Sequence, residues 1–154
     1  MSFDSGLSDL PLKGEGLRIG IVAAAYNRDR VDTLTRLVVS SLEEMGVLET
    51  DIRFERVPGS MEIPYAASQL AKNTDCHAVI GLGIVIAGDT SHHDVIGYST
   101  AISLQNIATS TGIPIVNGIL VVNTEQQADD RIGGKVDRGA EFARAAVALA
   151  NLKI

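Results

Sequence analysis

Hydrophobic residues follow two patterns along this chain. Continuous apolar runs over residues 17–25, 78–86 and 114–122 predict strands that are buried on both faces. Residues 51–57 alternate between apolar and charged side chains, which indicates a fourth, more exposed strand. Elsewhere, a spacing of three or four positions and strong turn signals predict helices over residues 31–45, 61–72, about 92–110 and about 137–150, with a short helix from Thr124.

The order of these elements predicts the fold. Strands that alternate with helices form a parallel sheet covered on both faces. Right-handed crossovers favour a four-stranded sheet of order 2-1-3-4, which is a flavodoxin-like three-layer αβα sandwich. We expect residues 17–154 to form this single α/β domain. Residues 1–16 show no periodicity, so we expect an N-terminal arm that contacts a neighbouring subunit or adds an edge strand to the sheet.

Local signals mark the ends of two helices. Gly46 is placed to end the first helix, and Ser60 follows a Pro-Gly break and could cap the second.

Composition narrows the class of protein. A formal charge of −6, with scattered basic residues, argues against nucleic acid as a partner. Cys76 is the only cysteine, which excludes an intrachain disulfide and suits a reducing compartment. Residues 1–16 lack the pattern of a signal peptide, and no apolar run reaches the roughly 18 residues of a membrane span. We therefore expect a cytoplasmic protein that does not bind membranes.

The predicted sheet also predicts where a ligand binds. Open parallel sheets bind ligands beyond the carboxyl ends of the strands, where the strand order reverses. Residues 26–28 and 88–93 form the two loops at that point. Residues 88–91 precede a helix, whose free N–H groups could bind an anion, although in such a sequence alone Asp89, Thr90 and Ser91 are more often simple caps. His92 and His93 suit proton transfer rather than metal binding, because adjacent helical residues diverge and no further ligand spacing follows.

Other polar residues allow two interpretations each. Tyr26 could stack on a planar ring beside the Asn27 amide, or cover the core next to a turn. Glu62 could accept hydrogen bonds from a sugar-like chain, or interact with its own helix dipole. Arg131 and Arg138 flank a Gly-Gly-Lys segment that could clamp a phosphate or be a solvated turn.

Nucleotide-binding motifs are not supported. The segment Gly81-Leu82-Gly83 lies within a strand and lacks the third glycine of a dinucleotide fingerprint. Gly134-Lys135 lacks the upstream glycine and the Ser or Thr of a P-loop.

Four blocks, taken in order, resemble the 6,7-dimethyl-8-ribityllumazine synthase family of riboflavin biosynthesis. They cover most of the chain from about Leu17 to Leu149, and four in order with compatible spacing are specific. The blocks are Tyr26-Asn27, VPGSMEIP (57–64), GLGIVIAGDTSHHD (81–94) and PIVNGILVVNTEQQADDR (114–131).

The resemblance implies a transferase that needs no metal and no organic cofactor. It condenses 5-amino-6-(D-ribitylamino)uracil with 3,4-dihydroxy-2-butanone 4-phosphate to give 6,7-dimethyl-8-ribityllumazine, phosphate and water. By position, Tyr26 and Asn27 bind the pyrimidine, and Ser60, Met61 and Glu62 bind the ribityl chain. Asn117 lines the same pyrimidine and ribityl site. The phosphate is then bound by Gly88, Asp89, Thr90, Arg131 and Arg138. His92 matches the residue that transfers protons, and His93 stands where relatives usually have an aromatic residue.

The resemblance also implies an assembly. Family members form homopentamers whose active sites are shared between subunits, and a short turn before the last helix accompanies larger shells. The turn over residues 133–136 is short, so we expect an icosahedral capsid of twelve pentamers rather than a free pentamer. Riboflavin synthase is a candidate partner. By position, Asn117, Arg131 and Arg138 should face Tyr26 and Glu62 of the adjacent chain.

Several positions depart from the family pattern. Ala87 replaces a basic residue, Asn117 replaces an aromatic or aliphatic one, and Arg138 replaces a lysine. The segment from Arg131 is one residue short. These changes leave room for a paralogue with altered activity.

Two other classes remain as alternatives. A flavodoxin-like module could bind a flavin or lumazine without turnover, but it would not need the pair His92 and Arg131. A receiver-type signalling domain phosphorylated on Asp89 would need an acidic pair after the first strand and a fifth strand, and neither is evident.

Overall fold

The computed structural model describes residues 10–152 and 154. Its sheet has four strands in the order β2-β1-β3-β4, all pairs being parallel. This confirms the predicted order, and no fifth strand occurs among these residues. The strands are β1 (Ile19–Ala24), β2 (Ile52–Val57), β3 (Ala78–Ile86) and β4 (Ile115–Val122).

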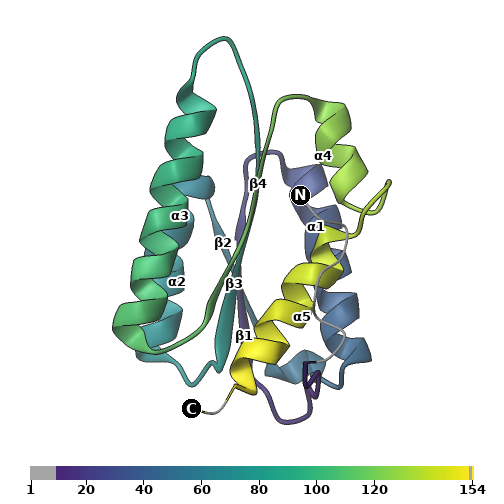
Figure 1. Ribbon diagram of the computed structural model, residues 1–154, viewed down its shortest axis with the longest axis vertical. Helices are drawn as coiled ribbons and strands as arrows, with labels where there is room; N and C mark the ends of the chain where they lie inside the picture. The colour runs from purple at the N-terminus through teal and green to yellow at the C-terminus, as the bar shows by residue number, and fades with distance from the viewer. Residues whose placement is uncertain (1–9, 153) are drawn as a thin grey trace.

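Helices cover both faces of the sheet (Figure 1). One layer holds α1 (Arg28–Glu44) and α5 (Arg138–Ala150), with the short α4 (Glu125–Arg131) above α5. The other layer holds α2 (Ile63–Asn73) and α3 (His92–Thr111). Two short 3₁₀ helices, η1 (Glu49–Asp51) and η2 (Ser60–Glu62), flank β2. The three-layer αβα sandwich is therefore confirmed.

Each face of the sheet has its own core. Strand residues alternate in direction, so Ile19 and Ile21 pack toward α1 and α5, whereas Val22 packs toward α2 and α3. β1 is buried at all six positions because it lies between two other strands and two helical layers. β2 is the edge strand and has no fully buried residue, as its alternating sequence predicts.

Helix ends follow local chemistry, with one exception. Gly46 follows α1 with φ of 102°, a left-handed conformation that favours glycine, as predicted. Ser60, the predicted cap of α2, is not a cap. It lies inside η2, is 8% exposed, and its side chain caps no helix; α2 begins only at Ile63, just before Pro64.

The N-terminal segment packs against the end of the sheet opposite to the candidate site. Residues 10–16 form no strand within this chain, and their pairing with the sheet of a neighbouring subunit stays a prediction. The backbone N–H of Gly14 donates to the Met45 carbonyl at 2.7 Å, and the Asn151 amide donates to the Lys13 carbonyl at 2.9 Å. The rest of the predicted arm, residues 1–9, lies outside the described residues.

None of the helices in the described ranges has the length and apolar character needed to cross a membrane.

Candidate active site

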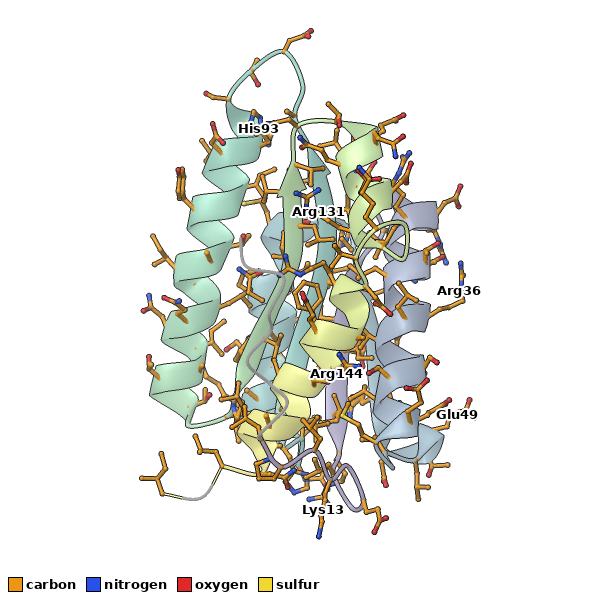
Figure 2. All side chains as sticks on the ribbon, turned by 45° about the vertical axis from the view of Figure 1, so that its right-hand side comes forward. Lys13, Arg36, Glu49, His93, Arg131 and Arg144 are labelled. Atoms are coloured by element: carbon orange, nitrogen blue, oxygen red, sulfur yellow. The ribbon has the colours of Figure 1, made fainter. Side chains whose placement is uncertain are left out.

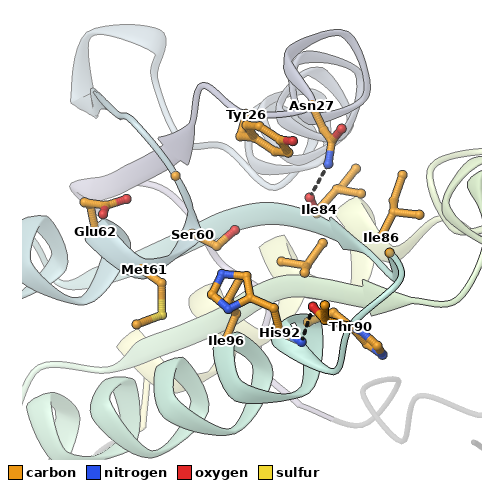
Figure 3. Close-up of a pocket in the computed structure, with 14 residues that line it drawn as sticks. Tyr26, Asn27, Ser60, Met61, Glu62, Ile84, Ile86, Thr90, His92 and Ile96 are labelled. Atoms are coloured by element: carbon orange, nitrogen blue, oxygen red, sulfur yellow. Dashed lines mark hydrogen bonds between the residues drawn. The ribbon is translucent and has the colours of Figure 1, made fainter.

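A pocket of about 500 Å³ opens at the carboxyl ends of β1 and β3 (Figure 3). Three segments form it: the turn between β1 and α1, the 3₁₀ helix η2, and the loop that leads from β3 into α3. Right-handed crossovers send α1 and α3 to opposite faces of the sheet. The β1–α1 turn and the β3–α3 loop therefore diverge at this edge and leave a space between them. The pocket lies at the strand-order reversal where the ligand was predicted, and these expected residues line it: Tyr26, Asn27, Ser60, Met61, Glu62, Gly88, Thr90 and His92.

The turn after β1 presents an exposed aromatic ring. Tyr26 is 74% exposed, so its ring is available to stack on a ligand rather than covering the core. Asn27 adopts φ of 55°, and no other non-glycine residue in the described part of the chain has positive φ. Its side-chain Nδ2 donates to the Ile84 carbonyl at 2.7 Å, which ties the turn to β3. One N–H of the Asn27 side-chain amide is therefore used within the protein, which leaves its second N–H and its Oδ1 for a ligand.

The opposite wall comes from η2. The Ser60 hydroxyl packs directly against Gly83 of β3, where a Cβ would overlap it. Met61 is 45% exposed, and Glu62 is also exposed, so both are accessible from the pocket. This wall offers a hydroxyl, a thioether and a carboxylate to a ligand.

The third wall is the start of α3. Gly88 and Thr90 line the pocket, but Asp89 is exposed and is not part of the lining. Thr90 Oγ1 accepts a hydrogen bond from the His92 backbone N–H at 3.3 Å, and Ser91 makes no side-chain cap. The simple-cap interpretation therefore holds for Thr90 alone. The Asp94 N–H donates to the Ser91 carbonyl at 3.0 Å, whereas the N–H groups of residues 88–91 stay available to an anion.

The two histidines differ in their surroundings. His92 is exposed and points from α3 toward Ser60 and Met61 (Figure 3). The His93 side chain is 17% exposed; its Nε2 lies 3.4 Å from Asp94 Oδ1, and its buried Nδ1 has no partner among the described residues. Both line the pocket, but His92 is the one whose ring can meet a ligand freely.

Besides Asp89, three predicted residues lie outside the pocket, namely Asn117, Arg131 and Arg138. Asn117 lines a separate groove between α3 and β4, with Tyr98 and Val121, and its Oδ1 accepts from the Ile119 N–H. In Figure 2, Arg131 lies at the end of α4, whereas His93 lies in the first turn of α3.

The two arginines outside the pocket have local partners. Arg131 Nη1 donates to the Gln127 carbonyl at 2.9 Å. Arg138 pairs with Glu141, and its guanidinium lies 5.0 Å from the Phe142 ring centre. One chain by itself does not bring these residues to the ligand.

Sequence reasoning missed the apolar part of the lining. Ile84, Val85 and Ile86 form the floor at the end of β3, and Ile96 follows His92 by one helical turn. The position of the first three at the carboxyl end of a buried strand, and the four-residue spacing of the last, were usable signals.

Ion pairs lie on the first two turns of α1, next to the turn between β1 and α1. The hydrogen bond from Arg56 lowers the pKa of Asp32, and the hydrogen bond from Arg30 lowers the pKa of Asp129.

Within the described ranges, no group of three or more His, Cys, Asp or Glu side chains could hold a metal ion.

Comparison with known proteins agrees with the geometry. The model of the 6,7-dimethyl-8-ribityllumazine synthase family matches residues 16–153. A protein named 6,7-dimethyl-8-ribityllumazine synthase from Polynucleobacter necessarius is 38% identical over 97% of this chain and 85% of its own length. One of the same name from Bordetella petrii is 41% identical over 92% and 79%, and one from Thermococcus gammatolerans is 37% identical over 90% and 89%. The chain therefore belongs to the 6,7-dimethyl-8-ribityllumazine synthase family.

Proposed function

We propose that the pocket described above is where this chain performs the family reaction, the penultimate step of riboflavin biosynthesis. The chain is a transferase that condenses 5-amino-6-(D-ribitylamino)uracil with 3,4-dihydroxy-2-butanone 4-phosphate. The observation that carries the assignment to this pocket is the convergence of Tyr26, Glu62 and His92, from three separate segments, on one space at the carboxyl ends of the strands. An aromatic ring, a carboxylate and an imidazole are the groups needed to hold a ring and a polyol and to move protons.

The first substrate lies between Tyr26 and η2. The exposed Tyr26 ring stacks on the pyrimidine, and Asn27 Oδ1 accepts from one of its N–H groups. Ser60 and Glu62 accept hydrogen bonds from the ribityl hydroxyls, and Met61 packs on the carbon chain. This assignment places the reactive amine of the pyrimidine near the floor formed by Ile84 and Ile86.

The second substrate lies with its phosphate at the start of α3. The free N–H groups around Gly88 and Thr90 bind the dianion, and the helix dipole favours its charge. Asp89 contributes its backbone rather than its exposed carboxylate, because a carboxylate would repel phosphate.

The chemistry requires orientation and proton transfer. The pyrimidine amine attacks the ketone carbonyl, and loss of water gives an imine. Loss of a proton from the hydroxyl-bearing carbon then breaks the C–O bond to phosphate and leaves an enol. The enol tautomerises to a ketone, which the second amine attacks, and loss of a second water closes the ring. His92 takes a proton from the attacking amine and returns one to the departing oxygen, which suits an exposed imidazole at neutral pH. None of these steps transfers electrons to or from an external group, so they need no redox cofactor.

Neighbouring subunits complete the site. Asn117, Arg131 and Arg138 lie outside the pocket of their own chain, as expected if they serve the next one. The outer face of α3 carries large exposed apolar side chains, namely Val95 (57%), Tyr98 (73%) and Ile102 (62%). An exposed apolar face of this kind supports burial against another copy. We propose a cytoplasmic homopentamer with shared sites, assembled into an icosahedral capsid, with residues 1–16 as the arm between subunits and riboflavin synthase as a partner.

The activity is tested by mixing the purified protein with both substrates. We expect the absorbance and green fluorescence of the lumazine to appear together with inorganic phosphate, at a rate well above the spontaneous reaction. Omitting the protein and omitting either substrate are the controls. A rate no greater than that of the mixture without protein would reject the function.

Sharing of the site is tested by complementation. Arg131→Ala and His92→Ala subunits, each weak alone, are co-expressed. In a mixed ring some sites combine an intact His92 with an intact Arg131 from the neighbour, so activity should exceed that of both parents. Light scattering coupled to size exclusion then measures the assembly. A fully active monomer or dimer would exclude shared sites, whereas an active free pentamer would exclude only the capsid.

A further inference from the structure

A partly buried ion pair lies behind the turn that carries Tyr26. Arg56 of β2 donates through Nη1 to the carbonyl of Ala24, the last residue of β1, at 3.1 Å. Its Nη2 donates to Asp32 Oδ1, in the second turn of α1, at 2.6 Å. Both side chains are about three-quarters buried, with 25% of Arg56 and 31% of Asp32 exposed. One guanidinium therefore connects the residue before the turn to the helix after it.

The Tyr26 ring depends on this turn for its orientation. The ring is 74% exposed, so few contacts of its own hold it in place. Its position is determined by the backbone, whose N–H groups at Ala25 and Tyr26 donate to the carbonyls of Val57 and Pro58 at 2.7 and 3.1 Å. These acceptors follow Arg56 directly in the sequence, one at the end of β2 and one just beyond it. The same short stretch of chain thus supplies both the backbone and the side-chain contacts that hold the turn.

Arg56 is itself restrained. Its guanidinium lies 4.9 Å from the centre of the Phe54 ring, which limits its motion, and Asp32 also pairs with Arg28 at 3.5 Å. A planar guanidinium can bridge a carbonyl and a carboxylate in fixed directions, which a point charge cannot do equally well. A second arginine on the same strand, Arg53, pairs with Glu55 at 3.3 Å near the surface and contacts no part of the pocket.

We propose that Asp32 and Arg56 are positioning residues for the pyrimidine substrate, because they set where β1 ends and α1 begins and so determine how Tyr26 presents its ring. They act through Tyr26 and do not line the pocket themselves. This inference rests on the proposed function, in which Tyr26 stacks on the pyrimidine while the phosphorylated ketone binds at the start of α3.

The test separates the Michaelis constants of the two substrates. Arg56→Met keeps the apolar stem and removes the guanidinium. Because misplacement of a binding group by about 1 Å can cost up to a hundredfold, we expect KM for the pyrimidine to rise about tenfold. KM for the phosphorylated ketone and kcat at saturation should stay close to wild type. Asp32→Asn should act in the same direction but less, and Arg56→Lys should recover part of the loss because it keeps the charge beside Asp32.

Arg53→Met is the matched control, since it removes a guanidinium from the same strand at a position remote from the turn. The inference is overturned if Arg53→Met equals Arg56→Met, if both Michaelis constants rise together, or if Arg56→Met and Asp32→Asn leave KM for the pyrimidine unchanged. Should Arg56→Met not fold, Asp32→Asn and Arg56→Lys decide the matter by the same criterion. A wild-type protein that forms no lumazine overturns the proposed function and this inference with it; normal turnover with unaffected variants overturns this inference alone.

Discussion

The side chain of Asn27 donates a hydrogen bond from Nδ2 to the backbone carbonyl of Ile84 at 2.7 Å. This bond joins the turn that follows β1 to the carboxyl-terminal part of the adjacent strand, β3. It satisfies a carbonyl next to the pocket floor, and it holds Asn27 in the left-handed conformation that asparagine tolerates better than most residues.

Replacement of Asn27 should therefore lower stability as well as substrate binding. Asn27→Gly loses only the hydrogen bond and should cost about 1 kcal/mol in free energy of unfolding. Asn27→Ala also forces a side chain into the left-handed region and should cost roughly 1 kcal/mol more. Urea unfolding of both variants measures the difference. Equal stability of the two variants would show that the backbone relaxes at this position.

His92→Ala should slow condensation by about ten- to a hundredfold or more, because positioned acid–base groups are typically worth 10²–10⁴, part of which the spontaneous reaction masks. His93→Ala should slow it far less and should mainly lower the melting temperature, since the His93 side chain is only 17% exposed. Steady-state rates and thermal unfolding of both variants test this. Equal rate losses would reject the assignment within the pair.

Arg131→Ala should raise KM for the phosphorylated ketone much more than KM for the pyrimidine, because a guanidinium binds phosphate through two parallel hydrogen bonds. Lys135→Ala is a suitable control, since Lys135 is exposed on the adjacent turn and pairs with Asp130. Kinetics with each substrate varied in turn give the two constants. A loss that falls evenly on both substrates, or on the pyrimidine alone, means that Arg131 does not bind the phosphate.

Gly83→Ala should disturb the ribityl side of the pocket. A Cβ at residue 83 would overlap Ser60 Oγ and approach Ile63 Cδ1 to 3.3 Å, so Ser60 must move. We expect a higher KM for the pyrimidine with little change for the phosphorylated ketone. Gly88→Ala, on the phosphate side of the pocket, should leave KM for the pyrimidine unchanged, because no described atom lies within 4 Å of its added Cβ. Wild-type kinetics in Gly83→Ala would show that Ser60 does not bind substrate.

The stabilisation that the Asp32–Arg56 pair gives to the folded state should decrease in acid. The pKa of Asp32 is lowered in the folded state by the hydrogen bond from Arg56, so the unfolded chain binds protons first as pH falls. The contribution of Asp32 to the free energy of unfolding is complete above its ordinary pKa of about 3.9. It is lost as the pH falls through the lower pKa of the folded state. Wild type should therefore melt above Asp32→Asn at pH 6, and the gap should narrow toward pH 3. A gap independent of pH would indicate that the ionised carboxylate is not the stabilising form.

Much of the fold was determined by the sequence alone. β3 begins and ends at the predicted residues, Ala78 and Ile86, because a continuous apolar run bounded by polar turns has only one stable placement, between two helical layers. The strand order followed from element order and crossover handedness. The residues at the carboxyl ends of β1 and β3 could be named as a site because parallel topology brings those ends to one edge.

Side-chain direction and long-range partners were decided only by the tertiary structure. Ser60 is buried against β3 instead of capping α2, since the chain needs an additional 3₁₀ turn after Pro58-Gly59 before it can enter the helix. Asn27 uses its amide N–H on a strand 57 residues away, a contact that no local pattern encodes. Arg56 bridges β1 and α1 for the same reason. Local sequence specifies where an element begins and ends, but which distant atom completes a hydrogen bond depends on how the finished layers pack.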